Sequence, residues 1–334
     1  MDRYSIILPV RNGGEYVKLC VHSILSQSFR HFNLIILDNN SVDGTKEWIR
    51  SLRDERIVLY ESDKSLSIEE NWGRITSVNK NEFITLIGHD DLLDMEYLTV
   101  MDKLISENPH ASIYLAHFRF IDANGSLIRK CKPMAPKETA AGFLKSFLTN
   151  QIDVNGTGYM VRSTDYDAVG GIPPYPSLLF ADFELWIRLT QMGYKVTAPE
   201  ECFSFRIHKS TTSTSTDKRL QMALEKFINF LVTLKNESPE LNKIIVEHSE
   251  DFLLAYCKGL SHRLLRTPLE KRDNLSVKSL LEKCKNYADM LSPGNHFNPS
   301  AVPSIRIARM LDQSAFGRKL FLQFKRIYSK PLLK

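Results

Sequence analysis

Short apolar runs alternate with helix-patterned segments over the first 120 residues, and this alternation constrains the fold more than any other feature of the chain. The apolar runs are rich in β-branched residues and have the length of strands. They cover residues 4–10, 32–37, 57–60, 83–87 and 112–118. The segments between them, residues 15–27, 43–52, 68–78 and 95–106, place apolar side chains three or four positions apart. This alternation predicts an α/β fold with a mainly parallel central sheet and helices on both faces.

The pattern changes after residue 118. Asp122-Ala-Asn-Gly125 predicts a hairpin turn between two short extended pieces. Helices are expected over residues 137–148 and 182–192, a short strand over 158–162, and extended pieces over 194–197 and 202–207. The serine and threonine run of residues 210–216 predicts a loop, and everything after Asp217 is expected to be helical. We therefore predict three parts, residues 1–118, 119–213 and a C-terminal helical region over 214–334.

Charge and cysteine usage limit the class of protein. The formal net charge of +5 favours anionic partners such as phosphates or acidic lipids, but there is no basic stripe interleaved with aromatic residues, so no nucleic acid is expected. The five cysteines are far apart and form no C-x-x-C pair, which indicates reduced thiols. No apolar run reaches the roughly 18 residues of a membrane-spanning helix, and the N-terminus lacks a signal peptide pattern. We expect a cytoplasmic protein.

Polar residues follow each of the first four expected strands. In an open parallel sheet, ligands bind outside the carboxyl ends of the strands. The strand ends carry residues 9–14, 38–45, 62–64 and 88–91. Because these four segments are expected at one edge of the sheet, they predict a binding pocket there.

Two of these aspartates have competing interpretations. Asp38 follows a buried strand, where its carboxylate can accept hydrogen bonds from a base or a sugar hydroxyl, but it can equally build the turn that the following Asn-Asn-Ser favours. Asp43 precedes Gly44 and a helix, and we favour a helix-capping role for it. The spacing alone leaves the role of Asp38 open.

The sequence Gly88-His-Asp-Asp91 ends the fourth strand with two adjacent carboxylates. Divalent cations such as Mg²⁺ and Mn²⁺ prefer oxygen ligands and share one or two carboxylates with substrate phosphates. A lone Asp-Asp pair, however, more often caps a following helix, here the one expected from Met95. His89 and His22 have no ligand spacing near them, so the pattern itself assigns both a structural role.

Five segments, taken in order, resemble the family 2 glycosyltransferases of the GT-A fold. They are SIILPVRN, ILDNNSVDGT, FITLIGHDDLLD, GGIPPYPSLLFADFELWIRL and FRIHKSTTS, and the resemblance covers residues 4–213. It implies a Rossmann-like GT-A domain with a nucleotide-sugar-binding half over residues 1–118 and an acceptor-binding half over 119–213. It also implies a divalent cation, Mn²⁺ or Mg²⁺, as cofactor.

The resemblance implies roles for particular residues. Asp182 matches the general base, and Asp90 and His208 match the metal and diphosphate site. Trp186 and Arg188, on the helix of the base, would face the acceptor. The nucleotide-sugar site would comprise Pro9, Val10, Arg11, Asn12, Asp38, Asp63, Asn71, His89, Asp90 and Asp91.

This sequence departs from the family pattern at two positions. Gly88 stands where the family has the first acid of its D-x-D motif, so one metal ligand is missing or replaced by water. Ala181 stands where the family often has glutamate, before Asp182. Asp182 itself has the alternative role of capping its helix.

The residues and the resemblance together predict an inverting glycosyltransferase that uses a nucleotide-diphosphate sugar, preferably a UDP-sugar. The expected acceptor is a saccharide or lipid-linked saccharide of a bacterial surface polysaccharide, such as O-antigen or capsule. The alternatives are a dTDP- or GDP-sugar-dependent transferase and a non-catalytic nucleotide-sugar-binding protein. A nucleotidyltransferase is disfavoured because no glycine-rich loop with a nearby lysine follows the first strand, and a dehydrogenase because no G-x-G-x-x-G does.

The last thirty residues carry eight lysines and arginines and a single acid, Asp312. Leu320, Phe321, Phe324, Ile327 and Tyr328 fall on one face at helical spacing, with cations opposite. Residues 305–334 therefore have the pattern of a helix that lies on an anionic membrane surface, on the inner face of the cell membrane. A helix docked on its own domain with a solvated basic face has the same pattern.

Overall fold

The computed structural model describes residues 2–208 and 216–328, the last two by their backbone alone. The chain forms two compact units. The first contains the residues up to Phe143 together with Ile152–His208, and the second contains Leu144–Gln151 and the chain beyond His208. Every predicted site residue belongs to the first unit.

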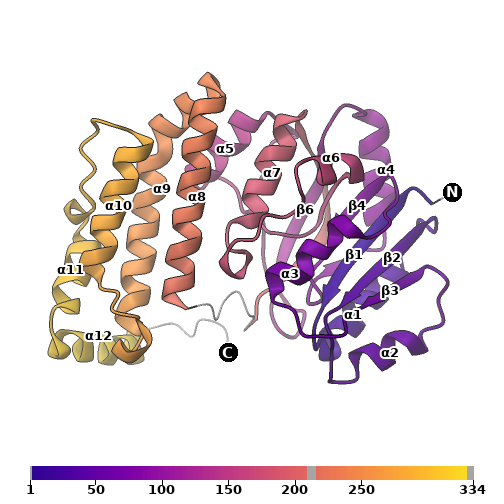
Figure 1. Ribbon diagram of the computed structural model, residues 1–334, viewed down its shortest axis with the longest axis horizontal. Helices are drawn as coiled ribbons and strands as arrows, with labels where there is room; N and C mark the ends of the chain where they lie inside the picture. Colours follow the sequence, from indigo (N-terminus) through magenta and orange to yellow (C-terminus); the bar gives the residue numbers. More distant parts are fainter. Residues whose placement is uncertain (1, 209–215, 329–334) are drawn as a thin grey trace. The chain divides into compact units, whose positions relative to one another are not determined.

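A ten-stranded sheet forms the centre of the first unit (Figure 1). Its strands follow the order β3-β2-β1-β4-β9-β6-β10-β5, with β7 beside β6 and β8 beside β10. The strands are β1 Tyr4–Val10, β2 Phe32–Asp38, β3 Ile57–Glu61, β4 Phe83–Leu86, β5 Leu92–Leu93, β6 Ile113–Ile121, β7 Leu127–Lys130, β8 Lys137–Glu138, β9 Tyr159–Arg162 and β10 Lys195–Arg206.

Helices connect most of these strands. They are α1 Gly14–Leu25, α2 Thr45–Ser51, α3 Ile68–Gly73, α4 Tyr97–Glu107, α5 Ala140–Leu148, α6 Ser163–Ala168 and α7 Ala181–Gln191, with 3₁₀ turns η1 Arg74–Ser77 and η2 Pro176–Leu178. Strand β1 is buried at all seven positions, so both faces of the sheet are covered there. The predicted α/β class is confirmed.

The sheet is mainly parallel, as predicted. Strands β1, β2, β3 and β4 pair in parallel, and so do β6 and β10. Strand β9 lies antiparallel between β4 and β6. The alternating pattern of the first 120 residues does not predict this insertion, because β9 comes from the second half of the domain.

Two predictions of local structure are correct only in part, since α5 begins at Ala140 and the two extended pieces are one strand. Residues 137–138 form strand β8 and not the start of a helix, because Glu138 pairs with the buried ammonium group of Lys195 while the backbone extends the edge of β10. The extended pieces at 194–197 and 202–207 belong to the single strand β10, whose register against β6 shifts between Ala198 and Phe203.

The second unit is helical, as predicted beyond Asp217. It contains α8 Asp217–Glu237, α9 Pro239–Arg266, α10 Val277–Leu291, α11 Pro303–Asp312 and α12 Ala315–Tyr328, with 3₁₀ turns η3 Leu269–Lys271 and η4 Pro299–Ala301. Helices α8, α9 and α10 run alongside one another in Figure 1. Thr216 caps α8 by accepting the N–H of Arg219, while the rest of the predicted serine and threonine loop lies outside the described residues.

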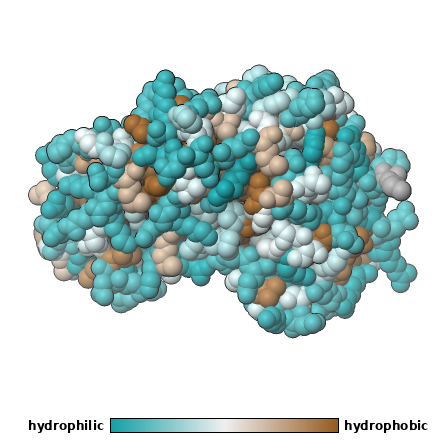
Figure 2. All heavy atoms as spheres, turned by 45° about the horizontal axis from the view of Figure 1, so that its top comes forward, coloured by the Kyte–Doolittle hydropathy of each residue, from teal (hydrophilic) through white to brown (hydrophobic). Residues whose placement is uncertain are grey.

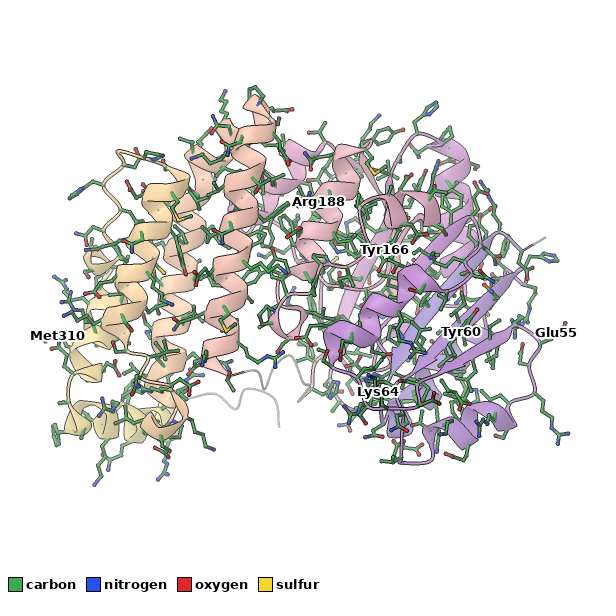
Figure 3. The ribbon with its side chains drawn as sticks, in the orientation of Figure 1. Glu55, Tyr60, Lys64, Tyr166, Arg188 and Met310 are labelled. Carbon is green, nitrogen blue, oxygen red and sulfur yellow. The ribbon has the colours of Figure 1, made fainter. Side chains whose placement is uncertain are left out.

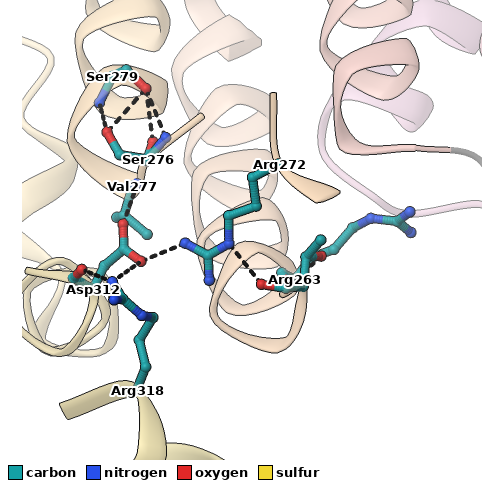
Figure 4. A network of polar contacts seen from close by, with 8 residues as sticks. Arg263, Arg272, Ser276, Val277, Ser279, Asp312 and Arg318 are labelled. Atoms are coloured by element: carbon teal, nitrogen blue, oxygen red, sulfur yellow. Dashed lines mark hydrogen bonds and ion pairs between the residues drawn. The ribbon is translucent and has the colours of Figure 1, made fainter. Parts of the chain in front are cut away.

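The tail is not one amphipathic helix. It divides into α11 and α12, and α11 is docked, since Ile305 and Ala308 are fully buried. The acid of the tail, Asp312, ends α11 and accepts hydrogen bonds from the guanidinium group of Arg272 at 2.6 Å and from the N–H of Val277 at 2.8 Å (Figure 4). Asp312 thus joins the end of α11 to the start of α10.

We predict that Asp312→Ala destabilises the second unit. The change leaves the guanidinium group of Arg272, which is almost inaccessible, without its carboxylate. Loss of one partner of a buried ion pair costs about 3–5 kcal/mol in the free energy of unfolding. Urea denaturation followed by circular dichroism would measure this loss. The control Lys278→Ala breaks only the exposed pair with Glu282 and should change stability by less than about 0.5 kcal/mol.

Candidate active site

The carboxyl ends of the first four strands lie at one edge of the sheet, as predicted. The parallel register pairs Val10 with Asp38 and Asp38 with Glu61. Backbone hydrogen bonds continue beyond the strands, from the N–H of Asn39 to Val10 at 2.9 Å and from the N–H of Ser62 to Asp38 at 3.0 Å. The residues after these strands therefore share one edge of the sheet.

Asp38 is the most enclosed acid at this edge. Its side chain is fully buried, and one carboxylate oxygen accepts the N–H of Ser41 at 3.1 Å. The other oxygen, Oδ1, has no hydrogen-bond partner among the described residues. A buried carboxylate oxygen without a partner is costly, so Oδ1 is suited to accept a hydrogen bond from a ligand.

Asn71 and Arg74 support Asp38 from the α3–η1 segment. Arg74 donates to the carbonyl oxygen of Asp38 at 3.0 Å and to the side-chain oxygen of Asn71 at 2.9 Å. Burial lowers the pKa of Arg74, while the charge of Asp38 acts in the opposite direction. Asn71 is itself buried and donates to the carbonyl oxygen of Leu37 at 3.4 Å. Sequence reasoning found Asn71 but missed Arg74.

The loop after β1 is tied to the loop after β2. The N–H of Asn12 donates to Ser41 Oγ at 2.9 Å, and the side chain of Asn12 accepts the N–H of Val42 at 2.9 Å. Asp43 accepts the N–H of Thr45, the first residue of α2, and also the N–H of Gly14. The N-cap residue of α2 is nevertheless Gly44, with no side-chain cap, so the favoured capping role of Asp43 is wrong in detail: Asp43 lies one residue earlier, bonds the first N–H of the helix and anchors the β1 loop.

The other predicted residues of the nucleotide site differ in accessibility. Pro9 and Val10 are buried in β1, so only their backbone can contribute. Arg11 and Asp63 are exposed, and Arg11 donates weakly to the carbonyl oxygen of Leu66 at 3.5 Å. Asp63 precedes Lys64, which Figure 3 labels, and both follow β3.

The segment Gly88–Asp91 is a turn and not a helix cap. The N–H of Asp91 donates to the carbonyl oxygen of Gly88 at 3.1 Å, and the short strand β5 follows. Helix α4 begins only at Tyr97, with Glu96 as its N-cap residue. The helix-cap interpretation of the two aspartates is therefore wrong.

Asp91 holds the surrounding chain together. It is 2% exposed, and its two oxygens accept hydrogen bonds from Thr157 Oγ1 at 2.8 Å and from the N–H of Arg206 at 3.0 Å. Burial and the nearby Asp90 raise the pKa of Asp91 well above its ordinary value. Because both oxygens are used within the protein, Asp91 supports the site and does not face a ligand.

Asp90 is paired with His208. The distance between Asp90 Oδ2 and His208 Nε2 is 2.6 Å, and the ring of Tyr16 packs on His208 at 4.9 Å between centroids. Although burial acts in the opposite direction, the hydrogen bond to His208 and the nearby His89 lower the pKa of Asp90. His89 is partly buried, and burial lowers its pKa. The structure thus brings together the two residues predicted for the metal site.

The space above Gly88 is occupied by Asp90. A Cβ atom at position 88 would lie 2.7 Å from Asp90 Oδ1 and 3.1 Å from Asp91 Oδ2. The carboxylate of Asp90 therefore fills the space where a side chain at position 88 would begin. This explains in physical terms why the site accommodates glycine where the family pattern has an acid.

Asp182 lies in the first turn of α7 but does not cap it. The N-cap residue is Phe180, and the hydrogen bond of the Asp182 carboxylate is with the N–H of Phe183 at 2.9 Å. Burial raises the pKa of Asp182 to about 6. A carboxylate with this pKa can accept a proton near neutral pH, which is the property required of a general base.

A segment that sequence reasoning missed connects Asp182 to the metal-site residues. Gly156 lies against the Asp182 side chain, at 3.5 Å for a Cβ built on the glycine, while Thr157 bonds Asp91. Gly158 has φ +79° and contacts the ring of Phe203 so closely that no side chain fits. The Asn-Gly-Thr-Gly sequence before the strand at 159 was the available signal for this backbone geometry.

Arg206 is a second residue that sequence reasoning missed. It is buried, donates to the carbonyl oxygens of Asp90 and Asp122 at 2.8 and 3.0 Å, and stacks on Tyr16. Its guanidinium group fixes the turn that carries Asp90 against the β6–β7 hairpin. The signal was its position two residues before His208 in the last matching segment.

The two predicted acceptor residues have other partners. Trp186 is 1% exposed, stacks on Tyr159 at 4.2 Å and donates to the carbonyl oxygen of Asn155, so an acceptor cannot reach its side chain. Arg188 bonds Glu184 at 2.9 Å further along α7 (Figure 3). Trp186 therefore supports the Asn155–Gly158 segment from the core.

Sequence comparison identifies the family. Residues 5–163 match the model of Glycosyl transferase family 2. Residues 5–163 form a family 2 glycosyltransferase domain. The glycosyltransferase is 24% identical over 221 residues to TuaG of Bacillus subtilis, named for teichuronic acid biosynthesis, and the match covers 63% of this chain and 81% of TuaG.

Solved structures establish the fold of this glycosyltransferase. S. aureus TarS 1-349, solved in complex with UDP-GlcNAc, has a TM-score of 0.65 at 15% identity, and the match covers 98% of this chain and 93% of that one. The mannosyltransferase PcManGT from Pyrobaculum calidifontis, solved with GDP-Man and Mn²⁺, has a TM-score of 0.53 at 14% identity, with 98% and 88% covered. The predicted GT-A fold is confirmed.

We predict that Gly88→Ala strongly impairs this glycosyltransferase. The added methyl group would displace the Asp90 carboxylate, and a misplacement of that size costs roughly 10- to 100-fold in turnover. Release of nucleotide from a nucleotide sugar would measure the effect. The control Gly259→Ala adds a methyl group into open space and should leave turnover unchanged. A fully active, folded Gly88→Ala variant would contradict this account of the turn.

Proposed function

We propose that this chain is an inverting glycosyltransferase that moves a sugar from a UDP-sugar to the hydroxyl group of a saccharide acceptor. The observation that supports this best is the carboxylate of Asp182, whose pKa is raised to about 6 by burial and which the Asn155–Gly158 segment links to the Asp90–His208 pair. A base and an anionic leaving-group site are what a direct sugar transfer requires.

The reaction takes place in one displacement. The Asp182 carboxylate accepts the proton of the acceptor hydroxyl group while the oxygen of that hydroxyl group attacks the anomeric carbon. The bond between that carbon and the oxygen of the β-phosphate breaks, and the leaving diphosphate carries the electron pair. Attack opposite to the leaving group inverts the anomeric configuration, and no covalent enzyme intermediate forms.

Asp38 supports the preference for a uracil nucleotide. Its unpartnered Oδ1 can accept the ring N–H of a uracil, in a site closed by Asn71 and Arg74. TarS was solved with UDP-GlcNAc, which agrees with this donor class, whereas PcManGT was solved with GDP-Man. A UDP-sugar is therefore the first donor to test, with GDP- and dTDP-sugars as the alternatives.

A divalent cation, Mn²⁺ or Mg²⁺, is proposed as the cofactor. Among the residues that the structure describes, no cluster of three or more His, Cys, Asp or Glu is arranged for a metal. Asp90 and His208 nevertheless fit such an ion by their chemistry: a carboxylate oxygen, which Mg²⁺ and Mn²⁺ prefer, and an imidazole nitrogen lie 2.6 Å apart and would together hold the cation. When bound, the cation would neutralise charge on the diphosphate, with substrate oxygens and water completing its coordination.

We predict that Asp182→Asn abolishes turnover and stabilises the fold at high pH. An unfolded chain ionises Asp182 near pH 4 and the folded chain near pH 6, so the folded state loses stability as pH rises through this window. Removal of the charge should add roughly 1–3 kcal/mol to the free energy of unfolding at pH 8 and nothing at pH 4. Urea denaturation at both pH values would measure this gain.

The activity part of this prediction uses UDP release from UDP-GlcNAc with Mn²⁺, in transfer to an acceptor or to water. Asp182→Asn should lose at least 100-fold in turnover while UDP still raises its melting temperature. The control variant Asp182→Glu keeps a carboxylate at this position, so it separates loss of the carboxylate from other effects of a substitution there. Unchanged turnover in Asp182→Asn would disprove the assignment of the base.

We further propose that the acceptor is a saccharide or lipid-linked saccharide of a bacterial surface polysaccharide. The similarity to TuaG supports this class. In the described part of the chain no helix has the length and apolar character needed to cross a bilayer. A lipid-linked acceptor lies at the membrane, and α12 offers a surface for contact with it.

Helix α12 has an apolar stripe bordered by cations. Phe316, Leu320 and Phe324 are spaced four residues apart and are 78%, 51% and 53% exposed. The same helix carries four cations and no acid, namely Arg318, Lys319, Lys325 and Arg326. On the face shown in Figure 2, by comparison, hydrophilic residues predominate and apolar ones form small separate patches.

The stripe points to an anionic bilayer as the partner of α12. Apolar side chains can enter the interfacial region while the cations contact anionic headgroups. Phe321, on the same helix, instead contacts His262 of α9 and docks α12 on its unit. The docked and membrane-bound interpretations of the tail therefore apply to different parts: α11 is docked, and α12 is proposed to bind the membrane. Lys330 and Lys334 lie outside the described residues.

We predict that Phe316→Ser combined with Leu320→Ser reduces binding to vesicles containing about 30% anionic lipid by at least tenfold, because each change removes buried apolar area worth about 1.5–3 kcal/mol. Vesicle co-sedimentation would measure it. The control pair Met222→Ser and Leu269→Ser changes exposed apolar residues outside α12. Equal vesicle binding by both double variants would contradict the proposal. It would also be contradicted if the α12 variant kept its vesicle binding and instead lost the ability to form a dimer.

A further inference from the structure

The turn that leads into α7 has an unusual backbone. Ser177, Leu178 and Phe180 all have positive φ, at 57°, 56° and 68°. None of the three is a glycine, and bulky residues rarely adopt this conformation. Such a backbone persists only where the surrounding structure holds it, and it is concentrated at functional sites. Two residues after Phe180 comes Asp182, the proposed base.

One contact holds this turn from outside. Glu69, in the first turn of α3, accepts the backbone N–H of Ser177 through Oε1 at 2.7 Å. Ser177 is 4% exposed, so the bond lies in a sheltered environment. A hydrogen bond to a carboxylate is stronger than one between neutral groups. Glu69 is therefore well placed to stabilise the strained turn.

A second contact holds the turn from the side of α7. Tyr175 is fully buried, and its hydroxyl group donates to Glu184 Oε2 at 2.5 Å. The other oxygen of Glu184 accepts from Arg188 at 2.9 Å. This contact fixes residue 175 to α7 itself. The contact of Glu69 differs from this one, because Glu69 belongs to α3 and not to α7.

The element that carries Glu69 also forms the nucleotide site. Asn71 lies two residues further along α3 and bonds the end of β2, and Arg74 in the adjoining η1 bonds Asp38. One short segment therefore contacts both the Asp38 site and the turn before Asp182. The contact between Glu69 and Ser177 was not predicted from the sequence.

We propose that Glu69 is a positioning residue that holds the Ser177–Phe180 turn and thereby keeps Asp182 in its enclosed, reactive position. The proposal rests on the role of Asp182 as base. Without the Glu69 carboxylate, the N–H of Ser177 loses its acceptor and the strained turn relaxes. Asp182 then moves and becomes better solvated, while the Asp38 site keeps its own contacts.

The experiment compares three variants of the full chain. Glu69→Ala removes the acceptor, and Glu69→Gln retains an oxygen at the same position. Glu70→Ala is the matched control, because Glu70 is on the same turn of α3 but, among the residues that the structure describes, has its hydrogen bonds with Ser67 in the capping box. UDP release from UDP-GlcNAc gives kcat and KM, and hydrogen–deuterium exchange reports on the Ser177 amide.

Glu69→Ala should lower kcat by at least tenfold, change the donor KM by less than threefold and speed exchange at Ser177 by at least tenfold. Glu69→Gln should recover most of kcat. The acid limb of the kcat profile should also move to lower pH in Glu69→Ala, since burial is what raises the pKa of Asp182. Among the described groups that act on Asp182 are the N–H of Phe183 and the phenol of Tyr159.

Three results would overturn the proposal. They are unchanged exchange at Ser177 in Glu69→Ala, an equal loss of kcat in Glu70→Ala, and a loss of kcat that Glu69→Gln does not recover. The exchange measurement needs no turnover, so it tests the contact between Glu69 and Ser177 even if the enzyme does not use UDP-GlcNAc as a donor. Failure of the base assignment is recognised separately, because it requires Asp182→Asn to keep its turnover.

Discussion

The buried carboxylate of Asp91 is the interaction on which the candidate active site depends. Its two oxygens bond Thr157 and the backbone of Arg206, so three segments distant in sequence meet at one side chain. One of these segments lies against Asp182, and another leads to His208. Removing a partner from such a buried group costs more than the bond itself is worth. Asp91 thus gives the neighbouring residues their geometry.

Much of the first unit could be predicted from the sequence. Period and residue type located β1 to β4 and the helices between them, because each element buries its own apolar face. The position of the carboxyl ends of β1 to β4 at one edge of the sheet followed from their parallel arrangement alone. The insertion of β9 and the strand β8 could not be predicted, since they depend on pairing between segments far apart in the chain.

The candidate site likewise contains residues that the sequence indicated and residues that it did not. Asp38 and Asp90 were candidates because they follow strands, whereas the metal role of Asp90 and the roles of Asp182 and His208 were assigned through the resemblance to the family. Arg206 and the Asn155–Gly158 segment were missed because their contribution is made through backbone groups and close packing. Trp186 was assigned to the acceptor because the resemblance places it on the helix of the base, and only the packing against Tyr159 shows that it is enclosed. Residue type indicates chemistry, whereas accessibility is a property of the assembled fold.

The crowding at Gly88 has a consequence for how the sequence can change. Because a side chain at position 88 and the carboxylate of Asp90 compete for one space, the two positions are not independent. An acid added at position 88 would be unfavourable while Asp90 keeps its conformation, and removal of Asp90 alone would leave His208 without this carboxylate partner. A switch between the two arrangements would need both changes together, so each arrangement tends to persist within a lineage.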